Sequence, residues 1–167
     1  MSTPKFPKTP ASFHGELKKR IGEYFKQKGR AQTGNFRLFF KAGLLVVSYI
    51  AVYIHLVFFT PPAVWAVAEC VLLGCLTAAI GFNVMHDGAH GSFSRYKWIN
   101  SIASNFANFM GASQHMWKMK HNVIHHTYTN INGIDDDIEA RPFLRLCDDQ
   151  VHYKIHRYQH VYFWAAY

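Results

Sequence analysis

The sequence predicts an all-α membrane protein, in which a transmembrane helical hairpin is combined with cytoplasmic amphipathic helices that carry paired histidines. Three observations predict this fold class. Two apolar runs of about twenty residues are each long enough to cross the roughly 30 Å hydrocarbon core of a bilayer. Of the 18 lysines and arginines, ten lie at or before Lys41 and eight at or after Arg95, outside the apolar runs or at their edge. The 11 histidines, a high number for 167 residues, include two HxxxH pairs.

The composition favours a membrane protein over a soluble domain or a nucleic-acid-binding protein. Half of the residues are hydrophobic, 17% are charged, and the formal net charge is +8. Between Ala42 and Ser94 there is no lysine or arginine, and the only carboxylates are Glu69 and Asp87. A nucleic-acid-binding protein would interleave its basic residues with its fold, whereas here they flank an uncharged block. We therefore expect a lipid bilayer and no nucleic acid as partner.

Residues 1–37 are expected to form a cytoplasmic basic tail and an amphipathic helix. Within residues 13–28, apolar side chains fall on one stripe of a helix and lysines and arginine fall elsewhere. The stripe consists of Phe13, Leu17, Ile21, Tyr24 and Phe25. A basic amphipathic helix of this kind is typical of segments that lie on a membrane surface. The alternative is a soluble helix that packs on its own domain.

Residues 38–85 are predicted to form the transmembrane hairpin. The runs 38–59 and 63–85 are joined only by Thr60-Pro61-Pro62, a link so short that the two helices must be antiparallel. Both outer ends of the hairpin then lie on one side of the membrane, together with every lysine and arginine. The positive-inside rule makes this the cytoplasmic side.

Three polar side chains within the hairpin need an explanation. The stem of Lys41 can lie in lipid while its ammonium group reaches the interface. His55 precedes Pro61 by six residues and Glu69 follows it by eight, so the two side chains should lie at similar depth. We expect them to pair, because an isolated carboxylate in lipid is costly.

Residues 86–160 are expected to lie on the cytoplasmic side. Residues 98–113 have apolar side chains at helical spacing, but this segment is too polar to cross a bilayer and should lie against it. Residues 148–158 are predicted to form another surface helix. Residues 161–167 begin a new apolar run, which we interpret as the start of a third transmembrane helix that is truncated before a second hairpin.

The histidines gather in two segments at the cytoplasmic end of the hairpin. MHDGAHGSF places His86 and His90 four residues apart, on one helical face and with rings about 6 Å apart. WKMKHNVIHHTYTN repeats this spacing with His121 and His125 and adds His126, which should point roughly 100° around the helix. Five imidazoles directed at one locus suit borderline metals such as iron, zinc or copper.

Further polar side chains are candidates to hold these rings in place by accepting their other N–H. The candidates are Asp87, Asn122, Asn130, the cluster Asp135-Asp136-Asp137 and His160. Histidines at four-residue spacing recur a third time, at His152, His156 and His160, but without an adjacent histidine pair. We interpret these three as surface residues or neighbours of the ligands. His14 and His115 are interpreted as ordinary exposed histidines.

The segments HDGAHGSF and HNVIHHTYTNINGIDDDIE resemble the first and second histidine boxes of the membrane fatty acid desaturase family. They are most similar to its acyl-CoA or acyl-lipid branch, which includes the front-end (linoleoyl-CoA-like) desaturases. Trp117, the stretch from His156 to His160 and the order of segments agree, so the resemblance extends from about Phe13 onward.

The resemblance implies a four-helix membrane fold with a cytoplasmic cap that holds a di-iron centre of two iron ions. The implied iron ligands are His86, His90, His121, His125 and His126, with no catalytic residue beyond them. It also implies O₂ as co-substrate, a fatty acyl-CoA or acyl-lipid substrate, and a cis double bond as product. Electrons would come from cytochrome b5 or ferredoxin.

The chain also departs from the family pattern. The third box, His or Gln followed by xxHH, is absent, and so is an HPGG haem motif, so the electron donor should be a separate protein. We therefore interpret the chain as the N-terminal part of a multi-pass desaturase of a bacterial inner membrane or endoplasmic reticulum. This part alone is expected to bind iron weakly and to be inactive. The alternatives are a related membrane di-iron hydroxylase and a non-enzymatic metal-binding membrane protein.

Overall fold

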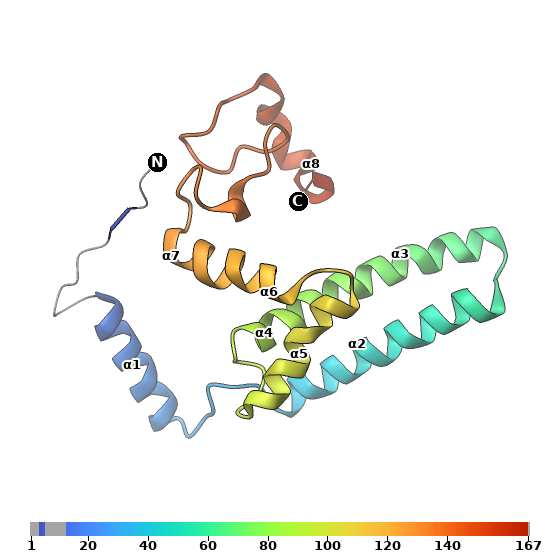
Figure 1. The fold of residues 1–167 in the computed structure, drawn as a ribbon, viewed down its shortest axis with the longest axis horizontal. Helices are drawn as coiled ribbons and strands as arrows, with labels where there is room; N and C mark the ends of the chain where they lie inside the picture. The colour runs from blue at the N-terminus through green and yellow to red at the C-terminus, as the bar shows by residue number, and fades with distance from the viewer. Residues whose placement is uncertain (1–3, 6–12, 167) are drawn as a thin grey trace. The chain divides into compact units, whose positions relative to one another are not determined.

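The computed structural model describes residues 4–5 and 13–166, and these residues form helices and loops without a β-strand (Figure 1). The all-α prediction is therefore confirmed for the described part of the chain. The described part of the chain divides into two compact units. One unit consists of residues 13–114, and the other consists of residues 4–5 together with residues 115–166.

The predicted amphipathic helix is α1 (Phe13–Gln27). None of its residues is buried, and Phe13 at the start of the apolar stripe is 83% exposed. On its polar side Arg20 Nε donates to Glu16 Oε1 at 2.8 Å, one helical turn away. Within the described residues, the apolar stripe of α1 is therefore not covered by the rest of the chain.

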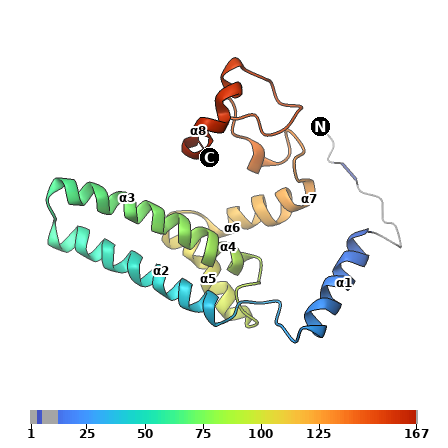
Figure 2. The ribbon, with the colours of Figure 1, turned by 180° about the vertical axis from the view of Figure 1, so that it is seen from behind.

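Two long helical stretches form most of the first unit. The first has 24 residues and consists of α2 (Phe36–Ile54) and the π-helical turn η1 (His55–Phe59). The second has 27 residues and consists of α3 (Ala63–Ile80), the π-helical turn η2 (Gly81–Met85) and α4 (His86–Ala89). Both are long and apolar enough to cross a membrane. α2 and α3 lie side by side and run in opposite directions (Figures 1 and 2).

Polar contacts link the two stretches near both of their ends. His55 Nδ1 lies 2.8 Å from Glu69 Oε1, which confirms the predicted pairing of these side chains. At the other end, the ammonium group of Lys41 donates to Asn83 Oδ1 at 2.6 Å. We expected the ammonium group of Lys41 to reach the membrane interface. In the structure it contacts Asn83 of the neighbouring helical stretch. Both contacts stabilise the alignment of α2 with the second stretch.

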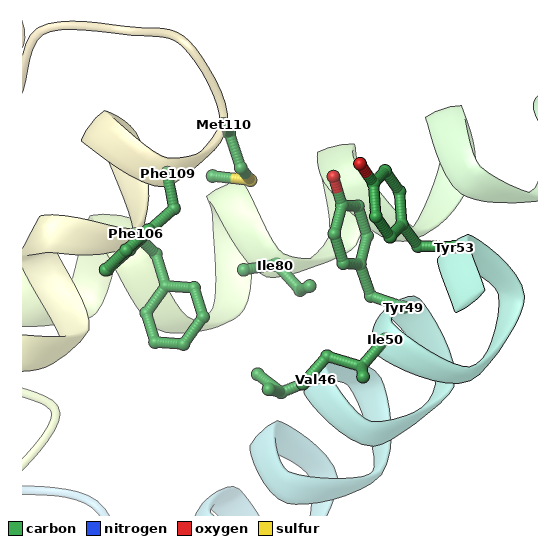
Figure 3. A pocket seen from close by; sticks show the side chains of 8 residues that line it. All are labelled: Val46, Tyr49, Ile50, Tyr53, Ile80, Phe106, Phe109 and Met110. Carbon is green, nitrogen blue, oxygen red and sulfur yellow. The ribbon is translucent and has the colours of Figure 1, made fainter. Parts of the chain in front are cut away.

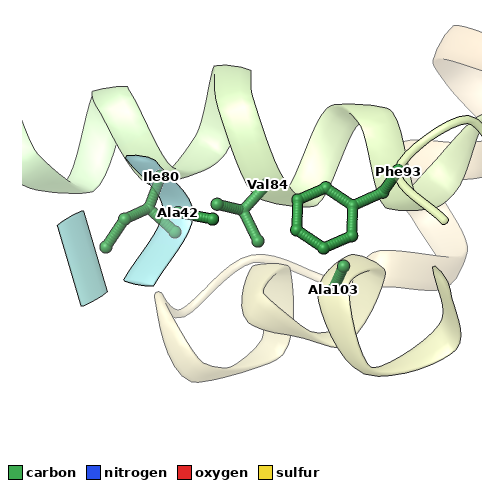
Figure 4. Packing of buried hydrophobic residues seen from close by; sticks show 5 residues of the cluster. All are labelled: Ala42, Ile80, Val84, Phe93 and Ala103. Carbon is green, nitrogen blue, oxygen red and sulfur yellow. The ribbon is translucent and has the colours of Figure 1, made fainter. Parts of the chain in front are cut away.

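The core of this unit lies where α5 (Lys97–Phe109) packs against η2 and α4. Figure 4 shows Val84 and Phe93 close to two small side chains, one from α2 and one from α5. The buried cluster consists of Ala42, Ile80, Val84, Phe93 and Ala103. Small residues at the crossing allow the helices to approach closely.

Gly88 of α4 sits at the closest point of this crossing. A Cβ added there would lie 2.6 Å from the backbone nitrogen of Ser104 and 2.7 Å from Ala103 Cβ. Since these distances are shorter than side chains tolerate, only glycine fits between the histidines at either end of α4.

The second unit is mostly irregular. After α6 (Gln114–Trp117) come the π-helical segment η3 (Lys118–His125) and α7 (His126–Tyr128). Two short 3₁₀ turns and one helix follow, η4 (Asp136–Ile138), η5 (Lys154–Tyr158) and α8 (Gln159–Ala166).

The predicted surface helix over residues 148–158 is wrong, because only η5 forms there. Side chains bond the backbone in place of a helix. The buried Gln150 donates to Ile138 O at 2.9 Å and accepts from the Leu146 N–H at 2.7 Å. The Tyr153 N–H donates to His156 Nδ1 at 3.2 Å at the start of η5. Local bonds of this kind compete with helix formation.

Candidate metal centre

The first histidine pair lies at the two ends of α4. The N–H of His86 donates to Gly81 O, five residues back, and so closes the π-helical turn η2. The ring centroids of His86 and His90 are 4.5 Å apart, closer than the separation of about 6 Å that α-helical spacing predicts. His86 Nδ1 also lies 3.3 Å from Asp87 Oδ1. The sequence could not reveal the π-helical turn, which rotates His86 relative to the rest of α3.

The second set of histidines lies on η3 and α7, and a π-helical winding replaces the α-helix on which the predicted direction of His126 was based. The His126 N–H donates to His121 O, five residues back, so the chain is wound more widely than an α-helix. In this geometry residue i+5 lies beside residue i. The ring centroids of His121 and His126 are 4.8 Å apart, those of His121 and His125 5.1 Å, and those of His125 and His126 5.2 Å.

Trp117 extends this cluster of rings. Its indole stacks on the His121 ring, with centroids 4.4 Å apart and planes inclined by 27°. The stacking restricts rotation of the imidazole about its side-chain bonds. In the sequence only the family resemblance pointed to Trp117, and the structure shows its contact with a candidate ligand.

Two carboxylates hold two of these rings. His121 Nδ1 lies 2.7 Å from Asp137 Oδ2, and His125 Nδ1 lies 2.9 Å from Asp135 Oδ1. A ring that donates from Nδ1 is fixed in the tautomer whose Nε2 carries the lone pair. This carboxylate–histidine arrangement is typical of metal-binding histidines. His121, His125 and Asp137 each offer one ligand atom within 4.8 Å of the others.

Asp135 is itself held by the backbone. Its carboxylate accepts the Asn130 N–H at 2.7 Å and the Asp137 N–H at 3.0 Å, and its side chain has no exposed surface. Burial by itself would raise the pKa of Asp135, but the hydrogen bonds from Asn130, His125 and Asp137 lower it below its ordinary value. The side chain is therefore an ionised acceptor that orients His125.

The other predicted neighbours of the ligands are placed differently. Asn130 contributes its backbone N–H rather than its side chain, from a left-handed conformation with φ of 63°. Asp136 is exposed and pairs with Lys120 at 3.0 Å. Asn122 is half-buried within η3, and His160 is exposed on α8.

The remaining histidines do not gather into a third metal-binding set in the described part of the chain. His156 is buried, its Nε2 lies 2.8 Å from Pro142 O, and its Nδ1 is occupied by the Tyr153 N–H. Because both ring nitrogens bond to backbone groups, His156 serves the loop rather than a metal. His14, His115 and His152 are exposed.

An apolar cavity of about 470 Å³ lies in the first unit, between α2, α3 and α5 (Figure 3). Figure 3 shows the rings of Tyr49 and Tyr53 side by side on α2, with the α5 side chains across the cavity. Its lining consists of Val46, Tyr49, Ile50, Tyr53, Ile80, Phe106, Phe109 and Met110. The cavity could not be predicted from the sequence, because three segments far apart in the chain build it. The tyrosines at four-residue spacing were its only visible signal.

Comparisons with known proteins agree with this chemistry. The family model described as fatty acid desaturase matches residues 60–167. The "sn-1 linoleoyl-lipid 6-desaturase" of Arthrospira platensis is 33% identical over 156 residues, which are 93% of this chain and 42% of the relative. The protein of the same name from Synechocystis sp. is 32% identical over 157 residues, 93% of this chain and 43% of the relative.

A plant relative is more distant. The "Acyl-lipid (8-3)-desaturase" of Physcomitrium patens is 27% identical over 157 residues, 93% of this chain and 33% of the relative. The chain thus spans less than half the length of these three relatives. No solved structure matches it.

Proposed function

The chain belongs to the fatty acid desaturase family, and we propose that it contributes to an O₂-dependent enzyme that introduces a cis double bond into a fatty acyl chain. The second histidine cluster carries the proposal. Its three rings lie within 5.2 Å of one another, and two of them donate to carboxylates. An assembly of imidazoles oriented in this way fits a metal better than it fits an ordinary exposed helix.

We assign the iron ligands to the histidines of both segments. They are His86, His90, His121, His125 and His126. The donor set fits the metal, because imidazole nitrogens suit iron and the neighbouring carboxylates fix ring orientation. Two bound iron ions would activate O₂ as the oxidant needed to remove hydrogen from an unactivated methylene group. The chain's own contribution is to position the rings, through the π-helical turns η2 and η3 and through Asp135 and Asp137.

The membrane placement follows from the charge pattern. We propose that α2–η1 and α3–η2 form a transmembrane hairpin within residues 38–85, with both outer ends in the cytoplasm. The outward surfaces of these helices are apolar and exposed, as at Phe58, Val64 and Val71. Residues 1–37 and 86–160 would then be cytoplasmic, and residues 161–167 would begin a further membrane segment. The membrane would be a bacterial inner membrane or the endoplasmic reticulum.

We propose a lipid-linked acyl chain as the substrate, in preference to acyl-CoA. The names of the relatives from Arthrospira platensis, Synechocystis sp. and Physcomitrium patens specify a linoleoyl-lipid or an acyl-lipid. The cavity between α2, α3 and α5 has the size and the apolar lining of a ligand pocket, which suits part of an acyl chain. The electron donor would be a separate cytochrome b5 or ferredoxin.

Metal analysis of variants tests the ligand assignment. We expect His126→Ala to lower bound iron by at least tenfold, as the loss of a ligand should. His115→Ala is the matched control, because His115 is exposed and lies only six residues before His121 on the same unit. Iron measured by mass spectrometry in the purified proteins gives the answer. Equal iron in both variants would contradict the assignment of His126.

A further inference from the structure

A second pocket lies in the linker between α1 and α2 and has a different chemistry. It has a volume of about 420 Å³ and is lined by Arg30, Ala31, Thr33, Asn35 and Arg37. Both arginines are exposed. No carboxylate within the described residues forms an ion pair with either guanidinium group. The pocket therefore carries two uncompensated positive charges.

The backbone of the linker is held in place at Gly34. The Gly34 N–H donates to Ser92 O at 3.0 Å, and a Cβ at Gly34 would collide with the carbonyl oxygen of Phe93. The Phe39 ring packs edge-on against the Phe93 ring at 5.2 Å. The pocket is thus attached to the segment that directly follows His90, at the histidine end of the first unit.

The pocket also lies where the chain enters its first apolar stretch. α2 begins at Phe36, and the rings of Phe36 and Phe40 are 80% and 64% exposed. On the other side of the linker, α1 leaves its apolar stripe uncovered. If α2 crosses the membrane as proposed, Arg30 and Arg37 lie at the depth of the lipid headgroups, between two apolar surfaces.

Phosphate is the anion that this arrangement fits. A guanidinium group is planar and presents a fork of N–H donors that matches two phosphate oxygens. The Thr33 hydroxyl adds a donor, and the first turn of α2 contributes the positive end of a 19-residue helix. The side-chain oxygen of Asn35 caps α2, because it accepts the Leu38 N–H at 3.3 Å, so we do not count Asn35 among the phosphate donors.

We propose that the Arg30–Arg37 pocket binds the headgroup phosphate of an anionic membrane lipid. This inference rests on the proposed membrane placement of α2 and goes beyond the proposed desaturation. A bound phosphate would join the α1–α2 linker to the bilayer surface next to the first histidine pair. The lipid would act as a structural ligand that holds the histidine end of the hairpin at a fixed depth.

Lipid retention tests the site. The purified protein is placed in nanodiscs of phosphatidylcholine with a minor fraction of phosphatidylglycerol, and native mass spectrometry counts the lipids that remain bound. We expect phosphatidylglycerol retention to fall about fivefold for each arginine that is replaced in the double variant Arg30→Gln/Arg37→Gln. Arg20→Gln, which removes one positive charge from α1 where Arg20 pairs with Glu16, is the control for the single variants Arg30→Gln and Arg37→Gln.

Four outcomes would overturn the site. Phosphatidylglycerol retained by the double Gln variant would exclude the pocket, and equal losses in Arg20→Gln would show diffuse attraction instead. Full retention by Arg30→Lys/Arg37→Lys, which keeps both charges but not the guanidinium forks, would show that charge alone holds the lipid, without the proposed phosphate geometry. Displacement by inorganic phosphate at equal concentration would show a free-phosphate site rather than a lipid site. Iron content, measured on the same samples, reports separately on the histidine centre.

Discussion

At the residue scale, Asp135 joins three partners next to the candidate ligands. Its carboxylate accepts from the His125 ring and from the backbone N–H groups of Asn130 and Asp137. It thereby closes the loop between α7 and η4 and orients an imidazole at the same time. The sequence indicated three consecutive aspartates as candidates, but it could not show that Asp135 is buried while Asp136 faces solvent.

The different environments of these two aspartates give a matched prediction. Asp135→Asn replaces one acceptor oxygen by an NH₂ group and leaves a buried N–H without a partner, which should cost about 1–3 kcal/mol of stability. Iron affinity should fall roughly 10–100-fold. Asp136→Asn should change neither quantity appreciably, since its ion pair with Lys120 is exposed. Thermal unfolding and iron titration of both variants check this, and indistinguishable variants would contradict the role of Asp135.

The pair of His55 and Glu69 makes a second prediction at this scale. Glu69→Gln keeps an acceptor oxygen opposite His55, so the activity of the intact enzyme should be largely unchanged. Glu69→Leu removes the acceptor and should lower the stability by about 1 kcal/mol. Activity and unfolding are measured for both variants. A complete loss of activity in Glu69→Gln would show that the carboxylate does more than join two helices.

At the scale of elements, the π-helical turns decide how the histidines are presented. The HxxxH spacing correctly indicated that members of each pair share a face. It could not show the i→i+5 bonds that bring His126 next to His121, because π-helical turns have no sequence pattern comparable to the α-helical period. The same limit applies to residues 148–158, where Gln150 and His156 bond backbone groups and no periodic pattern signals this.

The crossing of α4 and α5 gives a prediction for an element. Gly88→Ala should force the two helices apart, with a loss of about 1–3 kcal/mol of stability from overpacking. Gly43→Ala in α2 is the control, because a Cβ there meets nothing within 4 Å. That substitution should be neutral or stabilising by up to about 1 kcal/mol. Chemical unfolding in detergent compares the two, and equal stability would argue against the tight crossing.

At the scale of the whole molecule, the alternation of basic and apolar segments carries most of the predictable information. The amphipathic helix and the two long apolar helices were predicted within a few residues of their observed bounds, because each has a continuous periodic or apolar pattern. The cavity beside Tyr49 and the Arg30–Arg37 pocket were not predicted. The cavity depends on α2, α3 and α5, which meet only through tertiary packing. The pocket depends on a loop conformation that is fixed at Gly34.

Desaturation itself is tested most directly by mass spectrometry of acyl chains. The gene product that contains this chain is expressed in cells, and their lipid-linked fatty acids are compared with those of cells that express its His126→Ala variant. We predict acyl chains that have lost two hydrogens and gained a cis double bond, only with the unmodified protein. Acyl chains that have gained an oxygen would instead identify a hydroxylase. Unchanged acyl chains, despite bound iron and a supplied electron donor, would contradict an enzymatic role.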